Sequence, residues 1–151
     1  MADGEAGVIR RELFIEASPE TVFQFFTQAD KMARWMGVSH KLDPRPGGVY
    51  EVDVDGANVA MGEFKEVVAN SRIVFSWGWK GDGNPVPPGS SEVTVELAPK
   101  DGGTALTITH SGLPELMVPP HTEGWEHYCA RLVLAAAGGD PGPDPKVKKA
   151  A

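Results

Sequence analysis

Histidine has the clearest potential for proton transfer in this sequence, and His110 is the best placed of the four. It ends an expected strand in which apolar and polar residues alternate. It lies on the same face as Leu106 and Ile108, so it is expected to point inward. A histidine at the mouth of a cavity can titrate near neutral pH and act as an acid, a base or an orienting donor. A single histidine on an apolar face is more often hydrogen-bonded inside a core, and we favour that interpretation.

Patterns typical of metal sites or covalent catalysis do not occur in the sequence. It has no His-x-x-x-His, Cys-x-x-Cys or Asp-x-Asp-x-Asp spacing, so we expect neither a metal nor a cofactor. Glu63 and Glu66 lie three apart on an expected strand and should face opposite sides, unlike the paired carboxylates of a glycosidase. The lone Cys129 is expected to be a buried, inert thiol. We therefore assign no catalytic residue.

The aromatic residues indicate a pocket more than a reaction. In the strand expected at 72–79, every second residue lies on the same face, and these residues include Phe75, Trp77 and Trp79. Trp125 and Tyr128 should point from the last helix toward the same interior. Each ring alone could belong to a solid core. Together they favour a cavity, because tight cores are built from Leu, Ile and Val more than from stacked indoles.

The spacing of apolar residues predicts the strands and helices that position these rings, because it is two residues in a half-buried strand and about 3.6 in a helix. Residues 11–17 alternate as a half-buried strand, which runs into a helix capped by Ser18 with Pro19 in its first turn. A second short helix is expected at 31–36, capped by Asp30. At 121–137 the apolar residues again have helical spacing, which predicts a long last helix. Six further strands, separated by turn signals, are expected at 38–42, 49–54, 59–68, 72–79, 92–98 and 104–110.

These elements predict an α+β fold with the order β-α-α-β-β-β-β-β-β-α. Strands joined by short turns such as Asp55-Gly56 pair antiparallel, and the long last helix can cover one face of the sheet. We expect one domain over 8–138, with flexible tails at 1–7 and 140–151. The glycine- and proline-rich stretch 80–90 is expected to be a mobile loop.

Composition excludes several classes of partner. The formal net charge of −7 argues against nucleic acid or an anionic membrane surface. No apolar run approaches the length that spans a bilayer, and the acidic N-terminus is unlike a signal peptide. A single cysteine fits a reducing compartment. We expect a cytoplasmic protein with no stable membrane association.

Several short motifs follow one another along the chain. In chain order they include Ala17-Ser18-Pro19-Glu20-x-Val22-Phe23, Trp35-Met36-Gly37, Asp43-x-Arg45-x-Gly47-Gly48-x-Tyr50, Gly62-Glu63-Phe64-x-Glu66-Val67, Arg72-Ile73-Val74-Phe75-Ser76-Trp77, Gly103-Thr104-x-Leu106-x-Ile108 and Gly124-Trp125. Over roughly residues 8 to 138, the sequence with these motifs resembles the START-like (SRPBCC, Bet v 1-like) superfamily. Within that superfamily it is similar to the activator of heat-shock protein 90 ATPase homologue-like domains.

The resemblance implies a helix-grip fold, in which a curved antiparallel sheet wraps a long C-terminal helix and leaves an internal cavity. Relatives use this cavity to hold hydrophobic or amphipathic small molecules, and most bacterial members are single-domain proteins of unassigned function. We expect the same kind of ligand here, and a monomer or a homodimer. The residues expected to line the cavity are Trp35, Tyr50, Phe64, Phe75, Trp77, Trp79, His110, Trp125 and Tyr128.

Two alternatives stay open. Polyketide cyclases and aromatases of the superfamily are cavity enzymes, and this hypothesis needs a buried polar dyad formed by His110 with Tyr50 or Tyr128. The family name comes from a eukaryotic cochaperone with an additional N-terminal domain, and we do not expect that domain here, because the sequence leaves no room for it. A chaperone-accessory role is therefore the weaker hypothesis.

Overall fold

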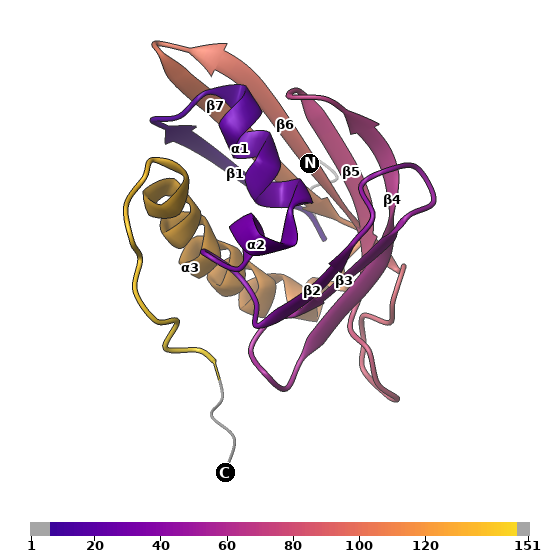
Figure 1. Cartoon of the computed structure of the whole chain (residues 1–151). Coiled ribbons are helices and arrows are strands. Elements are labelled where there is room, and N and C mark those ends of the chain that lie inside the picture. The colour runs from indigo at the N-terminus through magenta and orange to yellow at the C-terminus, as the bar shows by residue number, and fades with distance from the viewer. Residues whose placement is uncertain (1–6, 148–151) are drawn as a thin grey trace.

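Seven antiparallel strands form one curved sheet in the computed structural model, which describes residues 7–147 (Figure 1). The strand order is β1-β7-β6-β5-β4-β3-β2. The strands are β1 (Ile9–Ile15), β2 (Ser39–Leu42), β3 (Val49–Asp53), β4 (Val59–Val68), β5 (Arg72–Trp77), β6 (Ser91–Lys100) and β7 (Gly103–Ser111). The helices are α1 (Pro19–Thr27), α2 (Ala29–Met32), the 3₁₀ turn η1 (Glu115–Met117) and α3 (Val118–Ala136).

The sheet curves around the helices, so that α1, α2 and α3 all lie on its concave side (Figure 1). The long helix α3 packs against β1 and α1, and its buried face carries Trp125, Tyr128 and Leu132. The predicted α+β helix-grip architecture is confirmed. No helix within residues 7–147 is long and apolar enough to cross a membrane.

The helices begin where local chemistry allows. In α1 the backbone N–H of Thr21 donates to the Ser18 side chain at 3.2 Å, and Pro19 occupies the first helical position, as predicted. For α2 the prediction was wrong. The helix spans Ala29–Met32 after Gln28, so Asp30 lies within its first turn and does not cap it. There its carboxylate still meets the positive end of the helix.

One end of the concave face is filled by stacked rings. Tyr50 and Phe75 stack with ring centroids 4.1 Å apart, and Phe64 packs edge-on to Tyr50 at 5.7 Å. The register of β4 against β5 shifts between Phe64 and Glu66. Because of this bulge, Glu63 and Glu66 are both exposed, and the prediction that they face opposite sides was wrong.

Strand β5 ends earlier than predicted, at Trp77. Gly78 follows it, and a Cβ there would lie 1.9 Å from the carbonyl oxygen of Pro87, so only glycine lets the chain pass this close. Trp79 continues as an isolated bridge to Ala60 and donates its backbone N–H to Val86. The loop after β5 is thus held against the sheet at its base.

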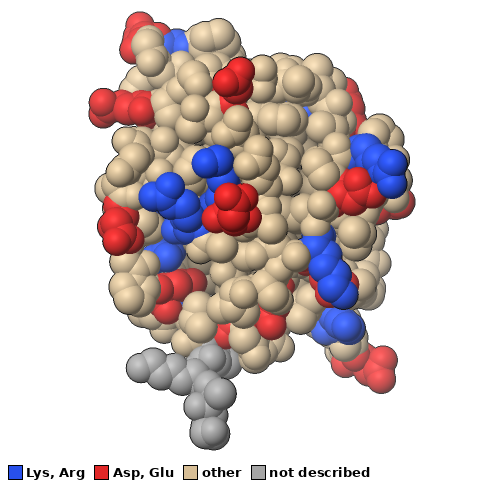
Figure 2. Space-filling view, in the orientation of Figure 1, with Lys and Arg blue, Asp and Glu red and all other residues tan. Residues whose placement is uncertain are grey.

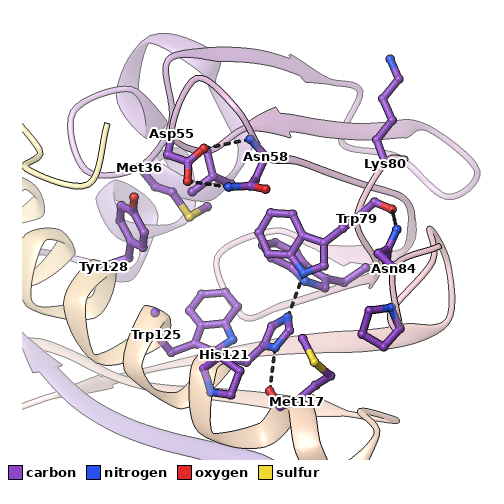
Figure 3. Close-up of a pocket in the computed structure, with 15 residues that line it drawn as sticks. Met36, Asp55, Asn58, Trp79, Lys80, Asn84, Met117, His121, Trp125 and Tyr128 are labelled. Carbon is purple, nitrogen blue, oxygen red and sulfur yellow. Dashed lines mark hydrogen bonds between the residues drawn. The ribbon is translucent and has the colours of Figure 1, made fainter. Parts of the chain in front are cut away.

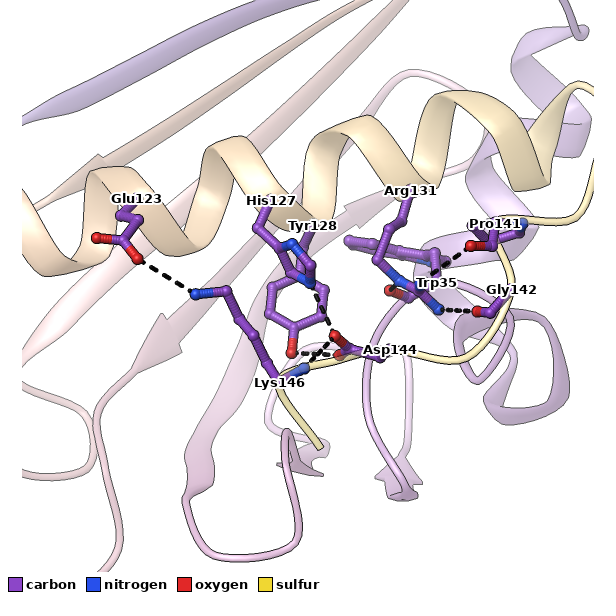
Figure 4. A network of polar contacts seen from close by, with 9 residues as sticks. All are labelled: Trp35, Glu123, His127, Tyr128, Arg131, Pro141, Gly142, Asp144 and Lys146. Atoms are coloured by element: carbon purple, nitrogen blue, oxygen red, sulfur yellow. Dashed lines mark hydrogen bonds and ion pairs between the residues drawn. The ribbon is translucent and has the colours of Figure 1, made fainter. Parts of the chain in front are cut away.

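Residues 140–147, here called the C-terminal segment, return along α3 (Figure 4). Arg131 donates from Nη2 to the carbonyl oxygen of Gly142 at 3.0 Å. Asp144 accepts from the Tyr128 hydroxyl at 2.6 Å and contacts Nε2 of His127 at 2.8 Å. This part of the expected tail at 140–151 is hydrogen-bonded to the domain, whereas 148–151, like 1–6, lies outside the described residues.

Candidate functional site

A pocket of about 380 Å³ opens between the β3–β4 hairpin, the loop after β5 and the N-terminal half of α3 (Figure 3). Its size is within the range of small-molecule sites. Most of its wall is apolar. The lining residues are Met36, Val54, Asp55, Asn58, Trp77, Trp79, Lys80, Asn84, Pro85, Met117, Pro120, His121, Gly124, Trp125 and Tyr128.

Three indole rings form the inner wall of the pocket. Trp77 ends β5, Trp79 lies just beyond it, and Trp125 comes from α3. The rings of Trp77 and Trp79 meet edge to face at 5.3 Å, and those of Trp77 and Trp125 are tilted by 41° at 5.7 Å. Such offset and edge contacts are favourable for aromatic pairs. The wall is therefore a rigid aromatic surface.

His121 is held as a neutral ring by its two partners (Figure 3). Its Nδ1 lies 2.8 Å from the carbonyl oxygen of Met117, which can only accept, so Nδ1 carries the proton. Its Nε2 then accepts from Nε1 of Trp79 at 2.9 Å. Burial lowers the pKa of His121, although the bond to Met117 acts in the opposite direction. The histidine thus fixes the orientation of Trp79.

His110 lies behind the wall, in β7, with none of its side chain exposed. Its Nδ1 accepts from Nε1 of Trp125 at 3.0 Å, and its Nε2 donates to Oγ of Ser91 at 2.9 Å. The Ser91 hydroxyl in turn donates to the carbonyl oxygen of Trp77 at 2.8 Å. Burial, and then the nearby His121, lower the pKa of His110 to about 3.

The pocket becomes polar at its mouth. Asp55 closes the β3–β4 turn and accepts from the backbone and side-chain nitrogens of Asn58 at 2.8 Å. Lys80 is exposed on the opposite loop (Figure 3). Asn84 donates to the carbonyl oxygen of Trp79 at 2.7 Å and so ties this loop down. Charged groups at the rim and rings inside make the site amphipathic.

Tyr128 connects the pocket with the C-terminal segment (Figure 4). Burial raises the pKa of its phenol, and the hydrogen bond to the Asp144 carboxylate raises it further, so the hydroxyl stays protonated. Burial alone would also raise the pKa of Asp144. Hydrogen bonds from Tyr128, the Lys146 backbone and His127 outweigh this effect and lower it.

The structure brings four of the nine predicted residues together at the pocket: Trp77, Trp79, Trp125 and Tyr128. The other five do not line it. Tyr50, Phe64 and Phe75 form the stacked cluster in the core, and His110 lies behind the wall. Trp35 donates to the carbonyl oxygen of Phe25 and lies beside a different hollow, between α2 and the C-terminal segment.

Several lining residues were not predicted. Met36 reaches the pocket from a loop and Met117 from η1, where no hydrophobic period marks an inward face. His121 lies four residues before Trp125 on the buried face of α3, so the helical period could have identified it. Gly124 is similar, because a glycine between the aromatic positions of an amphipathic helix could have been recognised as a gap. A Cβ at this glycine would have no neighbour within 4 Å, so the missing side chain leaves open space.

The hypothetical dyad of His110 with Tyr50 or Tyr128 is not formed. Both ring nitrogens of His110 are bonded elsewhere, Tyr50 is stacked in the core, and the Tyr128 hydroxyl donates to Asp144. Within residues 7–147, no three His, Cys, Asp or Glu side chains are placed to hold a metal ion. Burial raises the pKa of the Cys129 thiol to about 11, which makes its thiolate rare at neutral pH.

Comparison with known proteins shows which family this chain belongs to. Residues 16–137 match the model of the family described as Activator of Hsp90 ATPase homolog 1-like protein. The chain belongs to this family. It is 29% identical over 119 residues to the human protein called activator of 90 kDa heat shock protein ATPase homolog 1. That match covers 78% of this chain and 33% of the human protein, so the chain spans about a third of the length of this relative.

Two solved structures have the same fold. The AHSA1-like protein of Rhizobium etli is 46% identical with a TM-score of 0.73, and the match covers 95% of this chain and 90% of that one. The Aha1 dimer of Colwellia psychrerythraea has a TM-score of 0.74 over 87% of this chain and 97% of that one. At 19% identity, the second likeness concerns the fold alone.

Proposed function

We propose that this protein binds a small hydrophobic or amphipathic molecule in the pocket between the sheet and the N-terminal half of α3. The observation that carries the proposal is the wall of three indole rings around a space of about 380 Å³. Close packing normally fills the interior of a domain of this size. An apolar space with a rigid aromatic wall and an open mouth is suited to a ligand.

The arrangement of polar groups supports an amphipathic ligand. Met36, Trp77 and Trp125 present apolar surface inside, whereas Asp55 and Lys80 stand at the rim. A ligand can bury its apolar body and keep a polar end in water, so little desolvation of charge is needed. On the face shown in Figure 2, acidic and basic side chains are intermingled, which does not favour an extended polyanion as the partner.

Gly124 offers a direct test, because a leucine there fills the pocket. The Gly124→Leu side chain would enter open space and would also raise helix propensity. Ala130→Leu, on the exposed face of the same helix, adds a leucine away from the pocket and is the matched control. We expect the wild type and Ala130→Leu to bind 1-anilinonaphthalene-8-sulfonate equally, and Gly124→Leu to bind it roughly tenfold more weakly or not at all.

Fluorescence titration measures these affinities, and circular dichroism checks that the variants fold. Equal binding by Gly124→Leu would show that the probe lies elsewhere, which would refute the proposal. Native mass spectrometry of the purified wild type adds a second observation. A co-purified mass that survives only gentle conditions would identify the class of the natural ligand.

The oligomeric state stays a prediction. The Colwellia psychrerythraea relative is described as a dimer, and we expect this chain to be a monomer or a homodimer. Sedimentation or light scattering distinguishes the two. The pocket is lined by residues of a single chain, so the proposed binding does not depend on the answer.

A further inference from the structure

Two of the three indole rings in the pocket wall are held by neutral histidines. Nε1 of Trp125 donates to Nδ1 of His110 at 3.0 Å, and Nε1 of Trp79 donates to Nε2 of His121 at 2.9 Å. In each pair the accepting nitrogen must carry no proton. The position of each indole therefore depends on the protonation state of its histidine.

The two histidines differ in their access to the pocket. His110 lies behind the wall with none of its side chain exposed, whereas His121 is 8% exposed and lines the pocket. Burial lowers the pKa of both rings, and that of His110 falls to about 3. His121 is less buried, so we expect it to take up a proton first as the pH falls.

A proton on Nε2 of His121 would set two donors against each other, because the indole N–H of Trp79 lies across the same 2.9 Å. The imidazole is anchored to its own helix, since its Nδ1 donates to the Met117 carbonyl oxygen at 2.8 Å whether or not Nε2 is protonated. The Trp79 ring is only half-buried, where it packs edge to face against Trp77. The side chain of Trp79 is therefore the partner that moves.

The backbone around Trp79 would stay in place. Its N–H donates to the carbonyl oxygen of Val86 at 2.7 Å, and its own carbonyl oxygen accepts from Asn84 at 2.7 Å. The next N–H, of Lys80, donates to Val59 at 2.8 Å. Protonation of His121 would thus displace one ring of the wall without opening the loop, and a ligand packed against this ring would lose contact area.

The interior of the pocket offers no counter-charge to a protonated His121. His110, from β7, meets its ring edge to face at 5.5 Å and is neutral. Tyr128, on α3, keeps its hydroxyl proton because burial and Asp144 raise its pKa. The other ionisable residues described on the surrounding elements stand at the mouth of the pocket or are exposed on η1 and α3: Asp55, Lys80, Glu115 and Glu123.

We propose that His121 is a positioning residue for the ligand: its neutral form holds Trp79 in the pocket wall, and its protonation releases the ring and weakens binding. This inference rests on the proposed function, because it concerns the regulation of the same pocket. Binding is then favoured at neutral pH and release in mild acid.

NMR follows the histidine and the indole in the same sample. In protein with ¹⁵N-labelled histidine and tryptophan, the His121 signals are assigned by their loss in His121→Gln, and the Trp79 indole signal by its loss in Trp79→Phe. As the pH is lowered, the Trp79 indole proton should move upfield with the midpoint of His121, since it loses its hydrogen bond. The Trp35 indole, which donates to the carbonyl oxygen of Phe25, should stay unchanged.

The binding probe is N-phenyl-1-naphthylamine, which stays uncharged in mild acid. Fluorescence titrations are made on both sides of the His121 midpoint, and near-UV circular dichroism checks that the fold is native at each pH. We expect the wild type to bind the probe roughly threefold or more weakly on the acidic side. By linkage, a saturating concentration of probe should lower the His121 midpoint.

Two variants separate His121 from other acid effects. His121→Gln places an amide oxygen where it can accept from Trp79 at every pH, so its affinity should stay within about twofold of the neutral wild type throughout. His127→Gln removes a histidine from the same helix that contacts Asp144 outside the pocket wall, and it should keep the wild-type pH dependence.

The outcomes distinguish this inference from the proposed function. If the probe binds at neutral pH but acid weakens wild type and His121→Gln equally, or weakens neither, the positioning role is refuted and the pocket stands. The same holds if the Trp79 signal does not follow His121, or if His121 stays neutral until the fold is lost. If the probe does not bind the wild type at neutral pH, the proposed function fails, and this inference fails with it.

Discussion

Replacing His110 by glutamine is predicted to remove much of the sensitivity of this protein to mild acid. In the folded state the ring is fully buried and neutral, with Nδ1 accepting from Trp125 and Nε2 donating to Ser91. Protonating Nδ1 would break the bond from Trp125. Burial and the neighbouring His121 accordingly lower the pKa of His110 from 6.5 to about 3.

The sign and size of the effect follow from this pKa difference. The unfolded chain takes up a proton on His110 near pH 6.5, whereas the folded protein does not until about pH 3. The contribution of neutral His110 to the free energy of unfolding is therefore fully present above the pKa that His110 has in the unfolded chain. It is lost progressively as the pH falls below that pKa. By about pH 5 the loss from His110 alone is about 2 kcal/mol, and the lowered pKa of His121 adds to it.

Urea unfolding at a series of pH values measures this loss. The wild type should lose about 2 kcal/mol or more between neutral pH and about pH 5, and His110→Gln should lose about 2 kcal/mol less. Ile108→Val, on the same strand, lowers stability by about 1 kcal/mol without removing a titrating group and should keep the wild-type pH dependence. Parallel curves for His110→Gln and the wild type would refute the reasoning.

Three further predictions concern the core, the close approach of two strands and the C-terminal segment. Phe75→Ala removes a ring that is 1% exposed and should lower the free energy of unfolding by about 3–5 kcal/mol in urea denaturation; a loss below about 1 kcal/mol would contradict the stacked cluster. Gly62→Ala places a Cβ 1.8 Å from the Ser76 carbonyl oxygen, so the melting temperature should fall clearly, and an unchanged value would argue against this strand contact. Asp144→Asn weakens the bond from the Tyr128 hydroxyl, so hydrogen exchange should accelerate in residues 140–147 and not in β6; unchanged exchange would show that this bond does not hold the segment.

The fold could be predicted from the sequence because the patterns that indicate its strands and helices involve only neighbouring residues. Alternation identifies the strands, and Ser18-Pro19 marks the start of α1 regardless of the rest of the chain. The boundaries that were wrong depend on long-range contacts. Strand β5 ends at Trp77 because Gly78 passes close to the Pro87 backbone, which no local pattern reveals.

The lining of the candidate pocket was only half predictable. Alternation along a strand separates residues that face the concave side from those that face solvent, but it does not separate core residues from pocket residues. Tyr50, Phe75 and Trp77 all face the concave side, yet the first two are stacked in the core and only Trp77 reaches the open space. Which end stays open depends on where α3 crosses the sheet. The position of the C-terminal segment also depends on long-range contacts. Its glycines and prolines suggest disorder, but Asp144 can accept a hydrogen bond from Tyr128 only after α3 has packed against the sheet.

Methionine methyl groups provide the most direct test of binding in this pocket. Met36 and Met117 line it, whereas Met32 is buried in α2 and Met61 lies on β4, so neither of these two belongs to the wall. With ¹³C-methyl-labelled methionine, saturation with 1-anilinonaphthalene-8-sulfonate should shift the Met36 and Met117 resonances and give intermolecular NOEs to both. Met32 and Met61 should stay unchanged. Shifts confined to Met61, or no shifts at saturating probe, would contradict a ligand site between the sheet and α3.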